Sequence, residues 1–328
     1  MEIANVPIAI WGGFMGFVLL MLALDLGVFH RKSHSVGMKE ALIWSGVWIG
    51  LALVFNVGIF YFWDQIQPSS TYTNRDAGMA FLTGYLIEKA LSVDNIFVFL
   101  VIFGFFAVPD ALQHRVLFWG ILGALLFRAI FIAAGATILE HYSWSMVIFG
   151  LFLIATGIKM ALTHNKKFDP DRNPLIRALR SRMRITDDYV GSKFFTKING
   201  KLWATPLFLA LVTVEFTDVI FAIDSIPAIF AITTEPFLVF TSNIFAILGL
   251  RSLYFALSGL VQMFHYLSYG LAAILGFVGL KMIYGYVEKS IVESLPKFPV
   301  TVSLGVIGVI LGVSIIASMR KPLAAQSP

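Results

Sequence analysis

The sequence predicts an all-α polytopic integral membrane protein, and three observations predict this fold class. Of its 328 residues, 58% are hydrophobic and only 13% are charged, well outside the usual composition of a soluble domain of this length. Apolar runs of about 20 residues, the length that an α-helix needs to cross the hydrocarbon core, recur along nearly the whole chain. Strand-type alternation is absent, which argues against a membrane barrel.

The apolar runs predict about nine membrane-spanning helices. The first run follows no basic segment and is not ended by a small-residue cleavage site, so we expect a retained helix and not a signal peptide. The expected spans are 8–29, 41–63, 79–105, 115–138, 143–163, 206–232, 238–260, 268–287 and 299–318.

We expect five consecutive parts along the chain. Residues 1–63 form two N-terminal membrane helices, and 79–163 form a first unit of three helices. Residues 164–205 form a basic cytoplasmic linker, which contains an Asn-Gly turn typical of a hairpin and a stretch that fits a short basic interfacial helix or an ordinary linker. Residues 206–287 form a second, inverted unit of three helices, and 299–328 form the last membrane helix and a tail.

Basic residues gather in alternate loops, and positive charge in short loops marks the cytoplasmic side. Nine crossings with the N-terminus outside and the C-terminus in the cytoplasm place all of these loops on that side. The net charge of +5 therefore reflects topology, and we expect no nucleic-acid partner. The basic loops contain Arg31, Lys32, Lys39, His114, Arg115, the stretch 166–201, Arg320 and Lys321.

An internal repeat relates the two units of three helices. Glu88 and Asp94 have the same spacing as Asp218 and Asp224. Each unit has three crossings, so the second unit enters the membrane from the opposite side. Inverted repeats are a common plan in transporters, with the binding site near the midplane where the halves meet. The other matching features are Arg128 with Arg251, and the segment Gly157-Ile158-Lys159-Met160 with Gly279-Leu280-Lys281-Met282.

Acidic residues lie deep in two expected spans, where a charged residue carries an insertion penalty of roughly 2.5–3.5 kcal/mol. Such residues mark ion pathways, binding sites or ion pairs. Carboxylate and amide oxygens are hard donors that suit Mg²⁺, Ca²⁺ or Mn²⁺. Tight zinc or copper sites are not expected, because the chain has no cysteine and its six histidines fall in loops or at span ends. The candidate metal ligands are Glu88, Asp94, Asn95, Glu215, Asp218 and Asp224.

Helix geometry limits how these ligands can converge. Glu88 and Asp94 are about 120° apart around a helix axis, and Glu215 and Asp224 fall on nearly opposite sides. Pro227 could break the helix and free a backbone carbonyl for an ion. The alternative interpretation is complete ion pairing of the carboxylates without any ligand. The available basic partners are Lys89, Arg128, Lys159, Arg251 and Lys281.

Three long segments resemble the TerC family, and the similarity is greatest to its Alx branch. They are FLTGYLIEKALSVDNIFVFL, LWATPLFLALVTVEFTDVIFAIDSIPAIFAIT and TSNIFAILGLRSLYF. The resemblance covers nearly the whole chain and implies a protein of the bacterial inner membrane, related to LysE-type exporters and associated with manganese export. The family's acidic motifs fall on the six candidate ligands named above.

We therefore expect a secondary transporter that exports a divalent metal ion, with Mn²⁺ as the transported ion and no permanently bound cofactor. A membrane-embedded module that supplies metal to secretion-linked client proteins, or that interacts with partners in metal stress resistance, would need the same residues. An ion channel fits less well, since the repeat and buried charges indicate a gated site. We expect no enzymatic activity, because the chain contains no phosphate-binding loop and no nucleophile–base pair at membrane depth.

Overall fold

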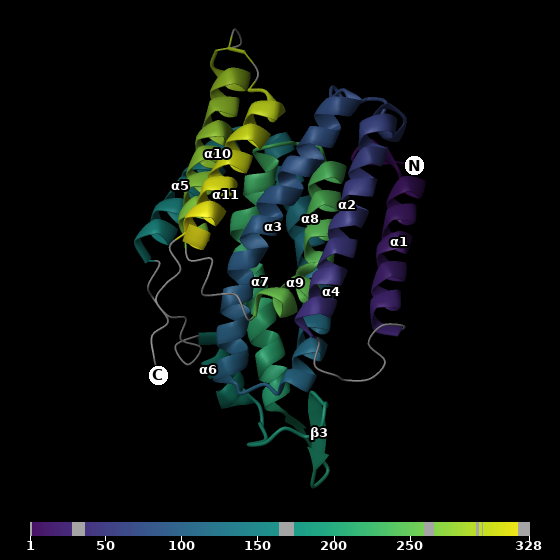
Figure 1. The fold of residues 1–328 in the computed structure, drawn as a ribbon, viewed down its shortest axis with the longest axis vertical. Helices are drawn as coiled ribbons and strands as arrows, with labels where there is room; N and C mark the ends of the chain where they lie inside the picture. The colour runs from purple at the N-terminus through teal and green to yellow at the C-terminus, as the bar shows by residue number, and fades with distance from the viewer. Residues whose placement is uncertain are drawn as a thin grey trace.

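The computed structural model describes residues 2–27, 37–163, 174–258, 266–292, 295–296 and 298–320. Long helices run side by side along the long axis of the molecule (Figure 1). The helices are α1 (Ile8–Gly27), α2 (Met38–Ile66), α3 (Asn74–Phe105), α4 (Asp110–His141), α5 (Ser145–Thr163), α6 (Pro174–Arg182), α7 (Pro206–Phe230), α8 (Pro236–Leu248), α9 (Leu250–Leu257), α10 (Leu267–Ser290) and α11 (Val300–Arg320).

The described strands form two short antiparallel hairpins. Strands β1 (Glu2–Ile3) and β2 (Val6–Pro7) precede α1, and β3 (Phe195–Ile198) pairs with β4 (Lys201–Ala204). Asn199 and Gly200 connect the second pair with φ angles of +51° and +74°, the positive values that a two-residue hairpin turn requires. The hairpin predicted from the Asn-Gly pair is confirmed.

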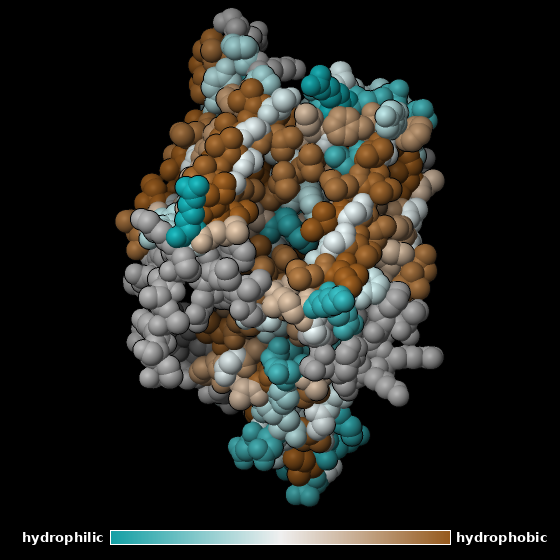
Figure 2. All heavy atoms as spheres, viewed as in Figure 1, coloured by the Kyte–Doolittle hydropathy of each residue, from teal (hydrophilic) through white to brown (hydrophobic). Residues whose placement is uncertain are grey.

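The polytopic membrane fold is confirmed, although the number of crossings that the helices support is smaller than predicted. Six described helices are long and apolar enough to cross a membrane, or seven if the bent pair α8–α9 counts as one span. The described apolar part of α1 is shorter, Ile8–Leu24, and α3 carries Glu88, Lys89 and Asp94 near its middle. In Figure 2 hydrophobic residues dominate the middle of the visible face, and hydrophilic residues gather toward its two ends.

The expected span 238–260 is not one continuous helix, because Gly249 divides its described part into α8 and α9, which meet at a bend of 41° and form a broken span or a re-entrant segment. A β-carbon on Gly249 would lie 2.7 Å from Lys89 Nζ and 3.1 Å from Trp48 Cβ. Lys89 Nζ donates a hydrogen bond of 3.3 Å to the carbonyl of Ala246. The ammonium group thus binds a carbonyl at the C-terminal end of α8, where a cation is favourable. By contrast, α7 continues through Pro227 to Phe230.

The two units of three helices pack against each other in a crossed pattern. Helix α3 packs on α8 and α4 packs on α7, while α5 and α10 share the largest contact between any two helices. A β-carbon on Gly150 would lie 2.7 Å from the carbonyl oxygen of Gly279, and one on Gly157 would lie 2.7 Å from that of Ala272. Small residues therefore bring the backbones of α5 and α10 into direct contact, as is common between membrane helices.

The described part of the linker, residues 174–205, folds against the ends of α3 and α4. The hydroxyl of Tyr189 donates to the carbonyl of Phe106 at 2.6 Å, and Arg115 Nη1 donates to Ser192 Oγ at 2.9 Å. Ile176 of α6 is buried, and Figure 1 shows α6 and β3 at the same end of the molecule. The expectations for Arg31, Lys32, the start of the linker at 164–173 and the tail at 321–328 fall outside the described residues.

Candidate functional site

Arg128 forms the centre of a buried polar cluster, which we call the Arg128 cluster and define as Arg128, Glu88, Asp218, Ser225 and Asn243. The Arg128 guanidinium is paired with Glu88 of α3, and its Nη2 lies 3.3 Å from Asp218 Oδ1 on α7. Its Nε also donates to Asp218 Oδ2 at 3.4 Å. Arg128, Glu88 and Asp218 are 1%, 0% and 3% exposed. One guanidinium therefore links carboxylates from both halves of the chain.

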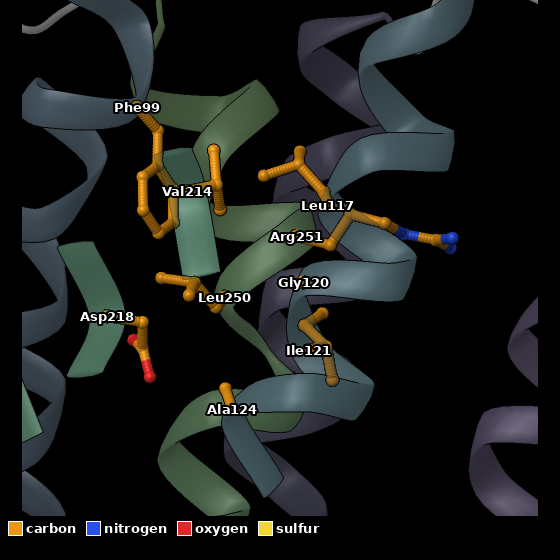
Figure 3. Close-up of a pocket in the computed structure, with 9 residues that line it drawn as sticks. All are labelled: Phe99, Leu117, Gly120, Ile121, Ala124, Val214, Asp218, Leu250 and Arg251. Atoms are coloured by element: carbon orange, nitrogen blue, oxygen red, sulfur yellow. The ribbon is translucent and has the colours of Figure 1, made fainter. Parts of the chain in front are cut away.

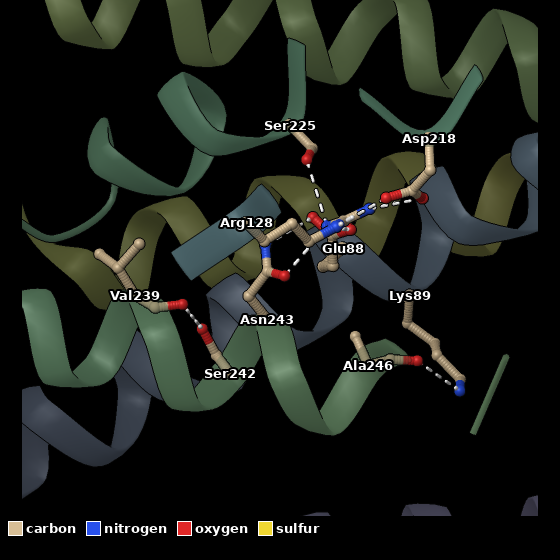
Figure 4. A network of polar contacts seen from close by, with 9 residues as sticks. All are labelled: Glu88, Lys89, Arg128, Asp218, Ser225, Val239, Ser242, Asn243 and Ala246. Carbon is tan, nitrogen blue, oxygen red and sulfur yellow. Dashed lines mark hydrogen bonds and ion pairs between the residues drawn. The ribbon is translucent and has the colours of Figure 1, made fainter. Parts of the chain in front are cut away.

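The neutral members of the cluster complete its hydrogen bonding, as Figure 4 shows. Asn243 Oδ1 on α8 accepts a bond of 3.0 Å from Arg128 Nη1, and Asn243 Nδ2 donates to Glu88 Oε2 at 3.3 Å. Ser225 Oγ lies 3.5 Å from the same Arg128 nitrogen. Removing one member of such a buried network leaves its partners charged and unpaired, which is strongly unfavourable. The cluster thus fixes the positions of α3, α4, α7 and α8.

A separate cavity, the Asp94 cavity, lies between the two halves beside this cluster. Its volume of about 20 Å³ is enough for one water molecule or one ion. Ser225 belongs to both the cavity and the Arg128 cluster. Two carboxylates, an amide and a hydroxyl supply its oxygens. The lining residues are Leu91, Asp94, Asn95, Met160, Phe221, Asp224, Ser225 and Leu275.

The two carboxylates of the cavity accept hydrogen bonds from neutral hydroxyls. Ser268 Oγ of α10 donates to Asp94 Oδ1 at 3.2 Å, and Thr156 Oγ1 of α5 donates to Asp224 Oδ1 at 3.1 Å. The side chain of Asn95, which also lines the cavity, is only 3% exposed. Two carboxylates beside an amide are oxygen donors of the kind that a hard cation takes in proteins.

The structure divides the six predicted ligands into three groups. Glu88 and Asp218 contact Arg128; Asp94, Asn95 and Asp224 line the cavity; and Glu215 lies apart from both, with its carboxylate against Gly123 of α4. Glu215 Oε2 is buried and makes no hydrogen bond to any described residue. Within the described ranges, no group of three or more histidine, aspartate or glutamate residues could hold a metal ion. Direct metal binding by the six residues stays a prediction.

Asp218 also faces a smaller cavity of about 10 Å³ on the other side of the cluster. Figure 3 shows its carboxylate directed between Leu250 and Ala124, whereas the Arg251 guanidinium points away from it. Arg128, one of the basic partners that the ion-pairing interpretation named, pairs with two of the acidic residues. Arg251, its counterpart in the repeat, does not face Asp218 in this view.

Sequence reasoning did not single out the α5 and α10 contributions to the Asp94 cavity. Thr156, Met160 and Ser268 are ordinary residues of apolar helices, and only the fold places them beside Asp94 and Asp224. A signal existed for Met160, because it occupies the same place in its motif as Met282 in the second half. This signal identifies Met160 as a position of the internal repeat, but it does not show which residues Met160 contacts.

The fold and its buried charged centre define a polytopic α-helical membrane protein. The chain belongs to the TerC family, because residues 73–324 match the family described as "Integral membrane protein TerC family". This finding confirms the resemblance seen in the sequence.

Several curated proteins are similar to this chain over nearly the whole length of both sequences. An uncharacterized membrane protein of Myxococcus xanthus is 53% identical over 95% of this chain and 92% of its own. Alx of Escherichia coli, whose name describes it as a candidate membrane-bound redox modulator, is 48% identical over 91% of this chain and 90% of its own. An uncharacterized membrane protein of Rickettsia bellii is 41% identical over 92% and 96%. No solved structure matches the chain.

Proposed function

We propose that this protein is a secondary transporter that exports a divalent metal ion, with Mn²⁺ as its cargo, through the Asp94 cavity. One observation supports this most directly: Asp94 and Asp224, from different halves, line one cavity together with the buried amide of Asn95. Two carboxylates neutralise a divalent cation, and hard oxygen ligands suit Mn²⁺. The choice of Mn²⁺ comes from the family resemblance.

The electrostatics of the centre favour a cation in this place. The two carboxylates of the Arg128 cluster exceed its single guanidinium by one negative charge, and the Asp94 cavity beside it adds two further carboxylates, of which Asp224 lies within electrostatic range of Lys159. A transported ion must also leave, so its site cannot bind too tightly. Two carboxylates with neutral oxygens make a weaker site than the three or four charged ligands of a permanent metal centre. We propose that Glu88 and Asp218 hold the helices of the site in place, and that Asp94 and Asp224 bind the transported ion.

We further propose nine crossings in the bacterial inner membrane, with the N-terminus outside, the C-terminus in the cytoplasm, and an inverted repeat of α3–α5 and α7–α10. Packing supports the repeat. Exchanging the halves turns the α3–α8 contact into the α7–α4 contact. It also turns the close approach of Gly150 to Gly279 into that of Ala272 to Gly157. Each of the two cavity aspartates accepts a hydrogen bond from a hydroxyl on the last helix of the other half. This is expected for a site between two related halves.

The test is Mn²⁺ flux into proteoliposomes that contain only this protein. We expect flux with the unaltered chain, and a strong loss with Asp94→Asn and with Asp224→Asn. Glu140→Gln, which removes a carboxylate at the exposed end of α4, is the matched control and should transport normally. Absence of flux by a folded, inserted protein would contradict the proposal.

Flux that appears only with an added partner protein would support the alternative, a module that supplies metal to exported client proteins. The redox role in the name of the Escherichia coli relative is not part of the proposal. Because this chain has no cysteine, its own residues cannot carry out thiol–disulfide exchange.

A further inference from the structure

We propose that Met160 gives the Asp94 cavity its preference for transition-metal ions over Mg²⁺ and Ca²⁺. This inference rests on the proposed transport function and identifies the class of ion that the site selects. Met160, which also packs against the hydrophobic core, is the one sulfur-containing residue among the eight that line the cavity, and four of the others carry side-chain oxygens: Asp94, Asn95, Asp224 and Ser225.

Helix α5 positions Met160 together with a residue that already contacts the site. Thr156 lies one helical turn before Met160 and donates its hydroxyl to Asp224. Residues four apart lie on the same face of a helix, so both side chains approach the cavity from α5. Gly157, between them, is in close contact with the carbonyl of Ala272 on α10. This contact holds the turn against α10, which contributes Leu275 to the same cavity.

The chemistry of a thioether differs from that of every other polar group in the cavity. Carboxylate, amide and hydroxyl oxygens are hard ligands that bind Mg²⁺, Ca²⁺ and Mn²⁺ alike. A thioether is a soft, polarizable ligand that favours softer transition-metal ions and offers little to Mg²⁺ or Ca²⁺. Within a cavity for a single ion, a sulfur ligand replaces an oxygen that the hard ions would need. Selection then follows from ligand type and not from charge.

Methionine also fills gaps in apolar cores, and the chain offers a matched comparison for that role. Met282 of α10 occupies the corresponding position of the second half and is 1% exposed. It does not line the Asp94 cavity. If Met160 only fills space, the two methionines should respond alike to the same substitution; if Met160 contacts the ion, only its replacement should change ion preference.

The experiment measures binding of Mn²⁺, Cd²⁺, Mg²⁺ and Ca²⁺ to the purified full-length protein by calorimetry, together with thermal unfolding. Met160→Leu conserves volume and removes the sulfur. We expect it to lower affinity for Mn²⁺, and more strongly for the soft probe Cd²⁺, by about 10-fold or more, the loss usual for a disturbed metal site. Affinity for Mg²⁺ and Ca²⁺ should stay unchanged. Met160→Gln supplies an oxygen in place of sulfur and should raise affinity for Ca²⁺. Met282→Leu should leave all four affinities unchanged.

Three results would overturn the inference while leaving the proposed function intact. The first is an unchanged ratio of Cd²⁺ to Ca²⁺ affinity in Met160→Leu, and the second is an equal change in Met282→Leu. The third is a parallel loss of affinity for all four ions with a lower unfolding temperature, which would show that Met160 only packs the core. If the folded, unaltered protein bound none of the ions, the proposed function itself would fail.

Discussion

The Arg128 cluster and the Asp94 cavity are built from the same parts but differ in what faces their carboxylates. Each contains one aspartate or glutamate from α3 and one from α7. Glu88 and Asp218 are paired with a guanidinium fixed in the protein. Asp94 and Asp224 accept hydrogen bonds from the hydroxyls of Ser268 and Thr156.

Helix geometry explains how one spacing produces two environments. Six residues along an α-helix advance about 9 Å and turn the side chain about 120° from its starting direction. The first acidic residue of each pair therefore faces α4 and the Arg128 side chain, and the second faces the cavity near α5 and α10. The comparison indicates that the Arg128 guanidinium holds one pair in place, and under the proposed function the other pair contacts the transported cation.

The largest effect should follow the loss of Arg128. Arg128→Gln leaves Glu88 and Asp218 buried without their counter-ion, and we expect the free energy of unfolding to fall by about 3–5 kcal/mol. Thermal unfolding of the purified protein, or a lower yield of folded protein, measures this loss. Arg128→Lys keeps the positive charge but loses the planar guanidinium group, so it should lower the free energy of unfolding by less than Arg128→Gln. Arg75→Gln, at an exposed site on α3, should be close to neutral. A neutral Arg128→Gln would contradict a supporting role for the cluster.

Neutralising the cavity carboxylates should affect binding more than folding. Asp94→Asn and Asp224→Asn each keep side-chain size and one oxygen, and should lower Mn²⁺ affinity by up to about 100-fold. Unfolding temperatures should fall much less than with Arg128→Gln, because asparagine keeps an acceptor oxygen for the hydroxyl of Ser268 or Thr156. Calorimetry and thermal unfolding on the same samples separate the two effects. Reduced stability with intact metal affinity would show that these aspartates are structural.

The close approach of α5 and α10 offers a test of the repeat. Gly150→Ala and Gly157→Ala each place a methyl group against a backbone carbonyl, so each should lower the free energy of unfolding by about 1 kcal/mol, the low end for overpacking. Gly276→Ala on α10 meets nothing within 4 Å and serves as the control. Equal losses at the two α5 positions would support related halves, and a loss at only one would argue against them.

The smallest effects should come from the hydroxyls that contact the cavity aspartates. Ser268→Ala and Thr156→Val each remove one hydrogen bond, worth about 0.6 kcal/mol between membrane helices. We expect similar, small changes in Mn²⁺ affinity from both, measured by calorimetry. If either variant abolished binding, its hydroxyl would have to contact the ion directly.

The sequence by itself determined the class of protein and the inventory of charged groups. Long apolar runs require helices in a bilayer, because backbone polar groups must be satisfied internally there. Asn199-Gly200 determined a hairpin, because both residues accept positive φ angles. Arg128 could be named as a possible partner of the carboxylates because an unpaired charge at membrane depth has a high energy. These are local or solvent-driven rules, and they can be applied to the sequence directly.

Only the tertiary structure decided which carboxylates face the Arg128 guanidinium and which face the Asp94 cavity. At the Gly249 bend, Lys89 and Trp48, which lie far away in the sequence, occupy the space that a β-carbon would need. The separation of Glu88 and Asp218 from Asp94 and Asp224 depends on how four helices pack around one guanidinium. Sequence periodicity gives the direction of a side chain around its own helix axis, but the neighbour in that direction is set by contacts between distant segments. For the same reason Met160 could be recognised as a repeat position and not as part of a cavity.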